Sequence, residues 1–449
     1  MMDRSKTSPW PLVAIILAVV LMPLNSTMIA VGLEPMATAL KVPETSVVWV
    51  VTSYLVVQAA LQPIAGKLGD LFGRRRLLLL GLAIFLTSSV LAASLPNLTA
   101  LICFRSGQAV GGALVVPSAM ALVRQLYQGD ALRRVLGSMG LIQGMGAAVG
   151  PLVGAALIHV GGWTYMFWIN LPFAATALIL GAKRLPQAPA AARRAIDYWG
   201  SLALASFLTV LALAVPHQAA SFSSLEVGAT LLACALFAGF VLAERKAADP
   251  VVHFSFFRRA PFRSANLSVL ASNFFMYSTL LYIPVFLRHR GLSTSATGLL
   301  LFIFSLSMSL MSYMGGHIGR RFGARRVIAL AFSLDLGVVL WYVGLSHVST
   351  MGYLLAGLIV AGIGAGIGNV AMQATLLEAV SPAMAGSSSG IFSTFRYVGS
   401  ITASALVSLM ISSLWAHVLF LALAALLGFV ALSGFPGKVP QANHVVPEA

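Results

Sequence analysis

The sequence predicts an all-α membrane protein with fourteen transmembrane helices, and three observations lead to this. Of the 449 residues, 59% are hydrophobic and only 9% are charged, whereas soluble domains average about 25% charged residues. Long apolar runs follow one another along the chain, each close to the roughly 20 residues that a helix needs to cross a bilayer. A glycine-rich, basic segment between two such runs also occurs twice. Together these features predict two related halves.

The apolar runs can be recognised in order along the chain. They lie at about 11–33, 47–65, 77–95, 99–122, 134–158, 165–182, 199–215, 226–243, 264–287, 295–314, 327–346, 351–375, 388–411 and 414–434. The first run is too long for the core of a signal peptide, and no small-residue cleavage site follows it. We therefore expect it to be retained as the first helix. The polar segments between runs are too short for a soluble domain.

The repeated segment sets the predicted architecture. Residues 65–76 read AGKLGDLFGRRR and residues 315–326 read GGHIGRRFGARR, with Gly73 in register with Gly323. If these two hairpins correspond, helices 1–6 match helices 9–14, and helices 7 and 8 are an inserted pair. The predicted divisions are a six-helix half over 1–182, linkers with the inserted pair over 183–262, a second six-helix half over 263–435 and a tail over 436–449.

The lysine and arginine residues give the expected orientation. If the N-terminus is placed inside and fourteen crossings are counted, 23 of the 28 fall in inner segments, and only Lys41, Arg288 and Arg290 fall in outer loops. Cytoplasmic loops of membrane proteins carry such an excess. We therefore expect a multi-pass protein of the bacterial inner membrane with both termini in the cytoplasm.

The remaining composition narrows the class of protein. A net charge of +16 would suggest nucleic acid binding in a soluble protein, but here the basic residues are spread over many predicted inner loops. Anionic lipid head groups of the bilayer are the expected partner instead. Both cysteines, Cys103 and Cys234, fall in apolar runs, so we expect no disulfide and no metal site. Without a nucleophile or phosphate-loop motif, we expect neither an enzyme nor a cofactor-binding protein. The compact size and the lack of a soluble adaptor are compatible with a monomer.

Five motifs occur in order along the chain. They are WVVTSY at 49–54, GKLGDLFGRR at 66–75, RSGQAVGGA at 105–113, GAAVGPLVGA at 146–155 and WTYMFWINLP at 163–172. With the predicted topology, they resemble the signatures of the major facilitator superfamily, and its 14-span branch of drug:proton antiporters most of all. The resemblance covers nearly the whole chain. It implies the major facilitator fold, with two six-helix halves plus an inserted helix pair, and transport by alternating access.

The resemblance assigns the first hairpin the role of a conformational latch. The residues concerned are Gly66, Asp70, Gly73, Arg74 and Arg75. Glycines let two helix ends approach closely, and a carboxylate at a helix end can cap it and pair with nearby arginines. The alternative is a basic loop that only sets orientation. Arg320 takes the place of the aspartate in the second copy, so we expect a one-sided latch.

A second motif is the predicted antiporter motif of helix 5. Gly146, Gly150 and Gly154 recur every four residues and form a smooth face against which another helix can pack closely. Pro151 removes a backbone donor and can bend the helix. The resemblance implies that this face lies between the two halves and serves antiport, whereas ordinary tight packing is the alternative.

Proton coupling normally requires a carboxylate that can gain and lose a proton within the membrane. Arg105 lies inside the fourth run, and the resemblance implies that it faces the central cavity and handles protons, with snorkelling to the outer surface as the alternative. The branch usually has an aspartate in helix 1, where this chain has Asn25, which cannot carry a proton. Glu34, which could pair with Arg105, and Asp335, which could instead make a buried structural hydrogen bond, are the two candidate replacements.

The same resemblance places a substrate cavity among helices 1, 4, 9 and 12. The candidates are Asn25, Gln108, Asn273, Phe274, Tyr277, Asn369 and Gln373, with Gln58, Gln143 and Arg396 on flanking helices. Amide, aromatic and methionine side chains suit adaptable binding of apolar compounds, and helix packing is the alternative for each residue. Because buried acids are few, neutral or amphipathic compounds are favoured over cations.

We therefore predict a transporter that exports drugs or other small amphipathic compounds, driven by the proton gradient and without a cofactor. A dedicated metabolite exporter and a proton symporter of the same fold are the alternatives. A non-transporting scaffold or sensor is less favoured, because no soluble domain is predicted.

Overall fold

The computed structural model describes residues 9–95, 97–127, 129–186, 198–214, 224–246, 254–345, 350–380 and 385–436, and their regular structure is helical. The N-terminal half contains α1 (Trp10–Leu40), α2 (Glu44–Val47), α3 (Trp49–Phe72), α4 (Arg74–Ser94), α5 (Leu98–Leu126), α6 (Gly129–Gly161), α7 (Tyr165–Trp168) and α8 (Asn170–Arg184). The next two helices are α9 (Tyr198–Ala214) and α10 (Ser224–Lys246). The C-terminal half contains η1 (Phe254–Arg258), α11 (Ala260–His289), α12 (Thr294–Phe322), α13 (Ala324–Gly344), α14 (Met351–Ile367), α15 (Asn369–Glu378), α16 (Ala385–Ser412), α17 (Leu414–Ala431) and η3 (Leu432–Gly434).

The predicted number of spans is not supported. In the described part of the chain, twelve helical segments are long and apolar enough to cross a membrane. Helix α9 has 17 residues, which is short of the roughly 20 needed. Helix α16 has 28 residues but is rich in serine and threonine, and it is not among the twelve. The sequence pattern located helices at both runs, but fourteen spans are not supported, because neither helix qualifies as a candidate span over its described residues.

The repeated hairpin has the same backbone in both copies. Gly73 joins α3 to α4 with φ 90° and ψ 127°, and Gly323 joins α12 to α13 with φ 88° and ψ 144°. A positive φ of this kind strongly favours glycine. In each copy the glycine N–H donates to the carbonyl oxygen four residues earlier, Gly69 or Gly319, at 3.1 and 2.9 Å. The sequence repeat is therefore also a repeat of local geometry.

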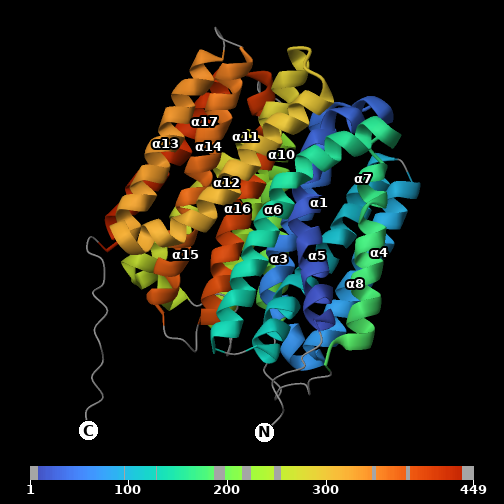
Figure 1. The fold of residues 1–449 in the computed structure, drawn as a ribbon. Coiled ribbons are helices and arrows are strands. Elements are labelled where there is room, and N and C mark those ends of the chain that lie inside the picture. The colour runs from blue at the N-terminus through green and yellow to red at the C-terminus, as the bar shows by residue number, and fades with distance from the viewer. Residues whose placement is uncertain are drawn as a thin grey trace.

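The helices of the two halves stand side by side, roughly parallel or antiparallel to one another (Figure 1). Within the N-terminal half α1 packs on α6 and α3 on α5, and within the C-terminal half α11 packs on α16 and α12 on α14 in the same way. Across the halves, α6 packs on α12, α3 on α16 and α1 on α11. Helices α9 and α10 pack on each other, and α9 also contacts α3.

The two ends of this bundle differ. At the hairpin end, defined by Gly73 and Gly323, lie the α3–α4 and α12–α13 connections. At the opposite end, the ion-pair end, Arg288 of α11 pairs with Glu34 of α1 at 3.2 Å, and His289 lies 4.0 Å from Glu44. Both contacts join one half of the molecule to the other.

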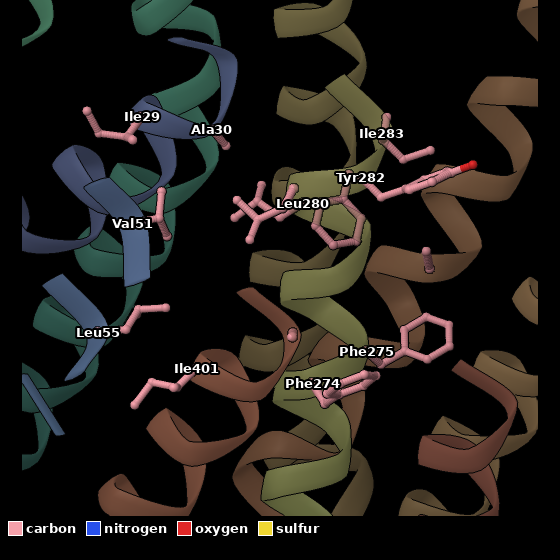
Figure 2. Packing of buried hydrophobic residues seen from close by; sticks show 14 of the residues in the cluster. Ile29, Ala30, Val51, Leu55, Phe274, Phe275, Leu280, Tyr282, Ile283 and Ile401 are labelled. Carbon is pink, nitrogen blue, oxygen red and sulfur yellow. The ribbon is translucent and has the colours of Figure 1, made fainter. Parts of the chain in front are cut away.

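Apolar packing between the halves continues inward from the ion-pair end. Side chains of α1 and α3, among them Ala30 and Val51, point toward Leu280 of α11, and Ile401 of α16 points toward α3 (Figure 2). In the same region Thr52 Oγ1 lies 2.6 Å from Ser404 Oγ. Buried apolar contacts of this kind exclude water, so the two halves are sealed together at this end.

Candidate substrate cavity

A cavity of about 530 Å³ lies between the two halves. The N-terminal half contributes residues of α1, α3, α5 and α6, and the C-terminal half contributes residues of α11, α12, α14, α15 and α16. A volume in this range fits a small organic molecule. Because both halves supply walls, a relative movement of the halves would change the shape and access of the cavity.

The cavity opens toward the hairpin end. Two lining residues on that side, Leu141 of α6 and Tyr313 of α12, are 42% and 58% exposed. Two lining residues nearer the ion-pair end, Leu280 and Phe304, are 3% and 1% exposed. As far as the described residues show, the cavity is thus accessible from the hairpin end of the bundle and closed by packed apolar side chains at the other.

Several predicted residues line this cavity. They are Gln58, Asn273, Tyr277 and Asn369, together with the flanking Gln143 and Arg396. The Tyr277 hydroxyl lies 3.2 Å from Ser26 Oγ, so one hydrogen bond crosses from α11 to α1 inside the cavity wall. Gln58 donates to the Tyr54 hydroxyl at 3.1 Å. The wall therefore presents amides and hydroxyls among methionine and aromatic side chains.

Sequence reasoning missed a row of serines on α12. Ser305, Ser309 and Ser312 line the cavity, and their spacing of four and three residues places them on one face of a helix. Ser309 Oγ donates to the Gly144 carbonyl oxygen of α6 at 2.6 Å, which ties the two halves together. A polar stripe with helical spacing on an otherwise apolar run was the signal that could have revealed them.

Four predicted residues are not among the residues that line the cavity. Phe274 is buried between α11 and α16 (Figure 2), because it lies about 100° around the helix from Asn273. Gln373 lies one turn beyond Asn369 toward the hairpin end and is exposed. Asn25 and Gln108 are fully buried inside the N-terminal half.

Asn25 and Gln108 belong to a buried polar network around Arg105. Arg105 is 1% exposed, so it neither snorkels to a surface nor lines the cavity. Its Nη1 donates to Gln108 Oε1 at 2.7 Å, and its Cζ lies 4.4 Å from the centre of the Tyr54 ring. Asn25 Nδ2 lies 3.5 Å from the same Gln108 oxygen. Tyr54 lines the cavity, so this network reaches the cavity through one aromatic ring.

The structure does not bring Glu34 to Arg105. Glu34 pairs with Arg288 at 3.2 Å and accepts a hydrogen bond from Thr38 at 3.2 Å. The hydrogen bonds that Arg105 makes go to neutral groups, the Gln108 side chain and the Val50 carbonyl oxygen. An ion pair between Glu34 and Arg105 would require Glu34 to leave Arg288 at the ion-pair end.

Asp335 is buried in α13, away from the cavity. Its side chain is 1% exposed, and its Oδ1 has no hydrogen-bond partner among the described residues. A Cβ atom added to Gly364 of α14 would lie 2.6 Å from this oxygen, so the carboxyl group is pressed against a glycine backbone. Asp335 therefore faces protein, but its Oδ1 does not make the buried structural hydrogen bond that was the alternative to a coupling role.

The glycine face of the antiporter motif packs within the N-terminal half, which corrects its expected place between the halves. Added Cβ atoms on Gly146, Gly150 and Gly154 would lie within 2.8 Å of Val20, Thr27 and Met28 of α1. The contact across the halves comes from the neighbouring face, where a Cβ on Gly298 of α12 would meet the Pro151 carbonyl oxygen at 2.9 Å. The four-residue spacing of the glycines correctly predicted a smooth helix face, but it could not predict which helix packs against that face.

The latch prediction stays untested. The surroundings of Gly66 and of the Asp70 side chain lie outside the described residues, as does the Arg320 side chain. Arg75 donates a hydrogen bond to the Ala182 carbonyl oxygen at the end of α8. This contact lies within one half.

The fold and the cavity define a multi-pass helical membrane transporter with a central cavity shared by two related halves. The chain belongs to the Major Facilitator Superfamily, whose family model matches residues 15–404 and 267–449. It is accordingly a transporter and not an enzyme. The described residues contain no group of three or more His, Cys, Asp or Glu side chains that could hold a metal ion.

Known relatives include both characterised and uncharacterised transporters. The chain is 39% identical over 424 residues to the uncharacterised transporter YvkA of Bacillus subtilis, and the match covers 94% of each protein. It is 28% identical over 411 residues to the tetracenomycin C resistance and export protein of Streptomyces glaucescens, covering 90% of this chain and 76% of that protein. It is 27% identical over 355 residues to the multidrug transporter MdtP of Bacillus subtilis, and the match covers 78% of this chain and 66% of that protein.

A solved structure shares the fold. The human organic anion transporter MFSD10 superposes with a TM-score of 0.61 over 95% of this chain and all of that chain, at 18% sequence identity. At this level of identity the likeness concerns the fold alone.

Proposed function

We propose that the protein exports small amphipathic compounds, including drugs, from bacterial cells in exchange for protons. The observation that carries this proposal is the cavity between the halves, which is open at one end and sealed at the other. Alternating access requires such an arrangement. The relatives named for multidrug transport and for tetracenomycin C resistance support export of amphipathic compounds. The 14-span drug:proton antiporter branch is the part of the superfamily to which this proposal assigns the chain.

The proposal includes an orientation in the inner membrane. The excess of lysine and arginine in the segments at the hairpin end supports a cytoplasmic location for that end and for both termini. The cavity would then be open to the cytoplasm and closed to the outside, which is the state that loads a substrate for export. One copy of the chain encloses the cavity, so a monomer is the proposed transporting unit.

Proton coupling needs a group that gains and loses a proton during the cycle. The described residues that line the cavity include no aspartate or glutamate. Glu34 at the ion-pair end and Asp335 in α13 are the two candidate carboxylates, with Arg105 as the charge that responds to them. We favour Glu34, because it lies in a contact between the halves whereas Asp335 is buried away from the cavity. Because Glu34 holds Arg288 across the halves, its protonation would release a contact that keeps the ion-pair end closed.

Everted membrane vesicles containing the protein test the proposal. The vesicles are energised, and a fluorescent probe reports the internal pH while single cationic, neutral and anionic amphiphiles are added. Substrate-triggered proton release in vesicles with the parent protein, and none in vesicles without it, is the expected result. No release with any compound, despite intact protein, would contradict proton-coupled export.

Two variants assign the coupling group. Glu34→Gln and Asp335→Asn each remove one carboxylate while keeping the size of the side chain. Loss of proton release in Glu34→Gln, with substrate binding retained, would assign coupling to the ion-pair end. Release that survives in both variants would exclude both carboxylates.

A further inference from the structure

The charge on the cavity wall is one-sided. Among the described residues that line the cavity, Arg396 of α16 carries the only formal charge, and no aspartate or glutamate lines it. The other polar groups are hydroxyls and amides, such as those of Ser26, Asn273 and Tyr277. Such groups can donate or accept hydrogen bonds but cannot balance a guanidinium.

Arg396 has no acidic partner in the described part of the chain. The described contacts of Glu34 and Glu44 with basic side chains go to Arg288 and His289, both at the ion-pair end. The Arg396 side chain is half-buried, and its Cζ lies 5.3 Å from the centre of the Tyr397 ring. Arginines within a membrane are costly and usually pair with a partner or mark a substrate pathway.

A second guanidinium adds to the positive potential. Arg105 is buried behind Tyr54, whose ring lies 4.4 Å from the Arg105 Cζ and also lines the cavity. The hydrogen bonds described for Arg105 go to neutral groups, so its charge is not cancelled locally. Coulomb interactions are stronger in surroundings of low dielectric constant than in water. A negative group in the cavity is therefore attracted by both arginines.

We propose that the cavity selects amphipathic organic anions, with a carboxylate head group on Arg396. The guanidinium offers paired N–H donors in a planar fork that matches a carboxylate. The apolar body of the molecule would lie against Met22, Phe304 and Met308, which line the same cavity. This inference rests on the proposed export function and names the substrate class of that cavity.

The anionic substrate also accounts for the absence of an acid at Asn25. Export of an anion from a cell that is negative inside is favoured by the membrane potential, by about 2.3 kcal/mol per charge per 100 mV, which is about a 50-fold concentration ratio. The membrane potential then supplies part of the driving force for export, and this part does not depend on a carboxylate that carries a proton through the membrane. A monocation would meet two arginines in the cavity and would be exported against the potential.

Binding to the purified full-length protein in detergent tests the inference with three matched probes. These are an aryl-alkyl carboxylic acid, its methyl ester and the corresponding primary ammonium compound, each measured by calorimetry. The parent protein should bind the carboxylate at least tenfold more tightly than the ester and the ammonium compound most weakly. Tightest binding of the ammonium compound, or equal binding of acid and ester, would overturn the proposal.

Variants assign the preference to Arg396. Arg396→Gln should lower carboxylate affinity about 10- to 100-fold and leave ester affinity unchanged, which also shows that the cavity is intact. Arg396→Lys should retain part of the preference, because the charge remains and the fork is lost. Arg263→Gln, an exposed site on α11 outside the cavity, removes the same charge and should change nothing. An unchanged preference in Arg396→Gln would refute the assignment.

Transport separates this inference from the proposed function. In proteoliposomes with an imposed potassium diffusion potential, carboxylate movement toward the positive side should follow the size of the potential in the parent and not in Arg396→Gln. Potential-driven carboxylate movement without proton exchange would support the anion site and contradict proton coupling. Proton exchange triggered only by cationic compounds would support coupling and overturn the anion site.

Discussion

Replacing Gly150 by alanine is expected to push α1 and α6 apart and to destabilise the protein. A Cβ atom on Gly150 would lie 2.0 Å from Thr27 Oγ1 and 2.9 Å from the Leu24 carbonyl oxygen. Thr27 Oγ1 also donates a hydrogen bond to the Ala147 carbonyl oxygen, 2.9 Å away on α6. The Thr27 side chain can rotate, but the Leu24 oxygen belongs to the backbone, so helix α1 itself has to move.

The expected loss of stability combines three contributions. Forcing an extra methyl group into a packed contact costs about 1–3 kcal/mol. Loss of the Thr27–Ala147 hydrogen bond adds roughly 0.6 kcal/mol, the average for such bonds between helices in a membrane. Alanine regains about 1 kcal/mol over glycine through its helix propensity. The net loss in the free energy of unfolding should therefore be about 0.6–2.6 kcal/mol.

Reversible unfolding in mixed micelles with increasing sodium dodecyl sulfate measures this quantity. Gly337→Ala is the matched control, because Gly337 lies within α13, is exposed and has no atom within 4 Å of an added Cβ. The control should be neutral or slightly more stable than the parent. A Gly150→Ala protein as stable as the Gly337→Ala protein would refute the close approach of α1 and α6.

A double-mutant cycle identifies the clashing atom. Thr27→Ala removes the oxygen that lies 2.0 Å from the added Cβ, so Gly150→Ala should cost less in that background. A coupling of at least about 0.5 kcal/mol is expected for residues in contact. Additive effects would mean that Thr27 is not the atom that the new methyl group meets.

Three further predictions concern the charged residues. Arg105→Ala should lower the free energy of unfolding by about 2–5 kcal/mol in the same assay and abolish transport. A large buried side chain and its hydrogen bonds are lost in this variant. Unchanged stability would contradict the buried network. Glu34→Gln should speed the labelling of a thiol introduced by Leu280→Cys, with the reagent added at the ion-pair end, at most about fivefold. The reason is that an exposed ion pair such as that with Arg288 contributes about 0–1 kcal/mol. A much larger change would assign this pair the main role in closure. Asp335→Asn should keep substrate-triggered proton release, because this side chain lies outside the cavity; loss of release in folded protein would make it the coupling acid.

The elements and their local geometry could largely be predicted from the sequence. Apolar runs located the long helices, because burial of about 20 apolar residues in lipid dominates their free energy. The repeated glycines marked two connections that share a backbone conformation, since a positive φ favours glycine at Gly73 and Gly323. Fourteen spans were not supported at α9 and α16, because the described residues of these helices are too short or too polar to qualify as candidate spans.

The site could be predicted only in part. Some of the polar residues chosen on the predicted cavity helices line the cavity and others do not, because each position along a helix turns the side chain by about 100°. Asn273 and Tyr277 therefore line the cavity, whereas Phe274 packs against α16. Arg105 was recognised as unusual, but its neutral partners come from α3 as well as from its own helix α5, and no sequence pattern joins them.

The sequence by itself determined a helical membrane transporter with an internal repeat, the glycines that its turns and close contacts require, and a scarcity of acids in its interior. Only the tertiary structure decided which residues meet. Glu34 and Arg288 are 254 positions apart and pair at the ion-pair end, and Arg396 enters a cavity whose described wall holds no acid. The physical reason is that hydrophobic periodicity fixes which residues form each helix, whereas the rotation and neighbours of a helix follow from packing between the halves.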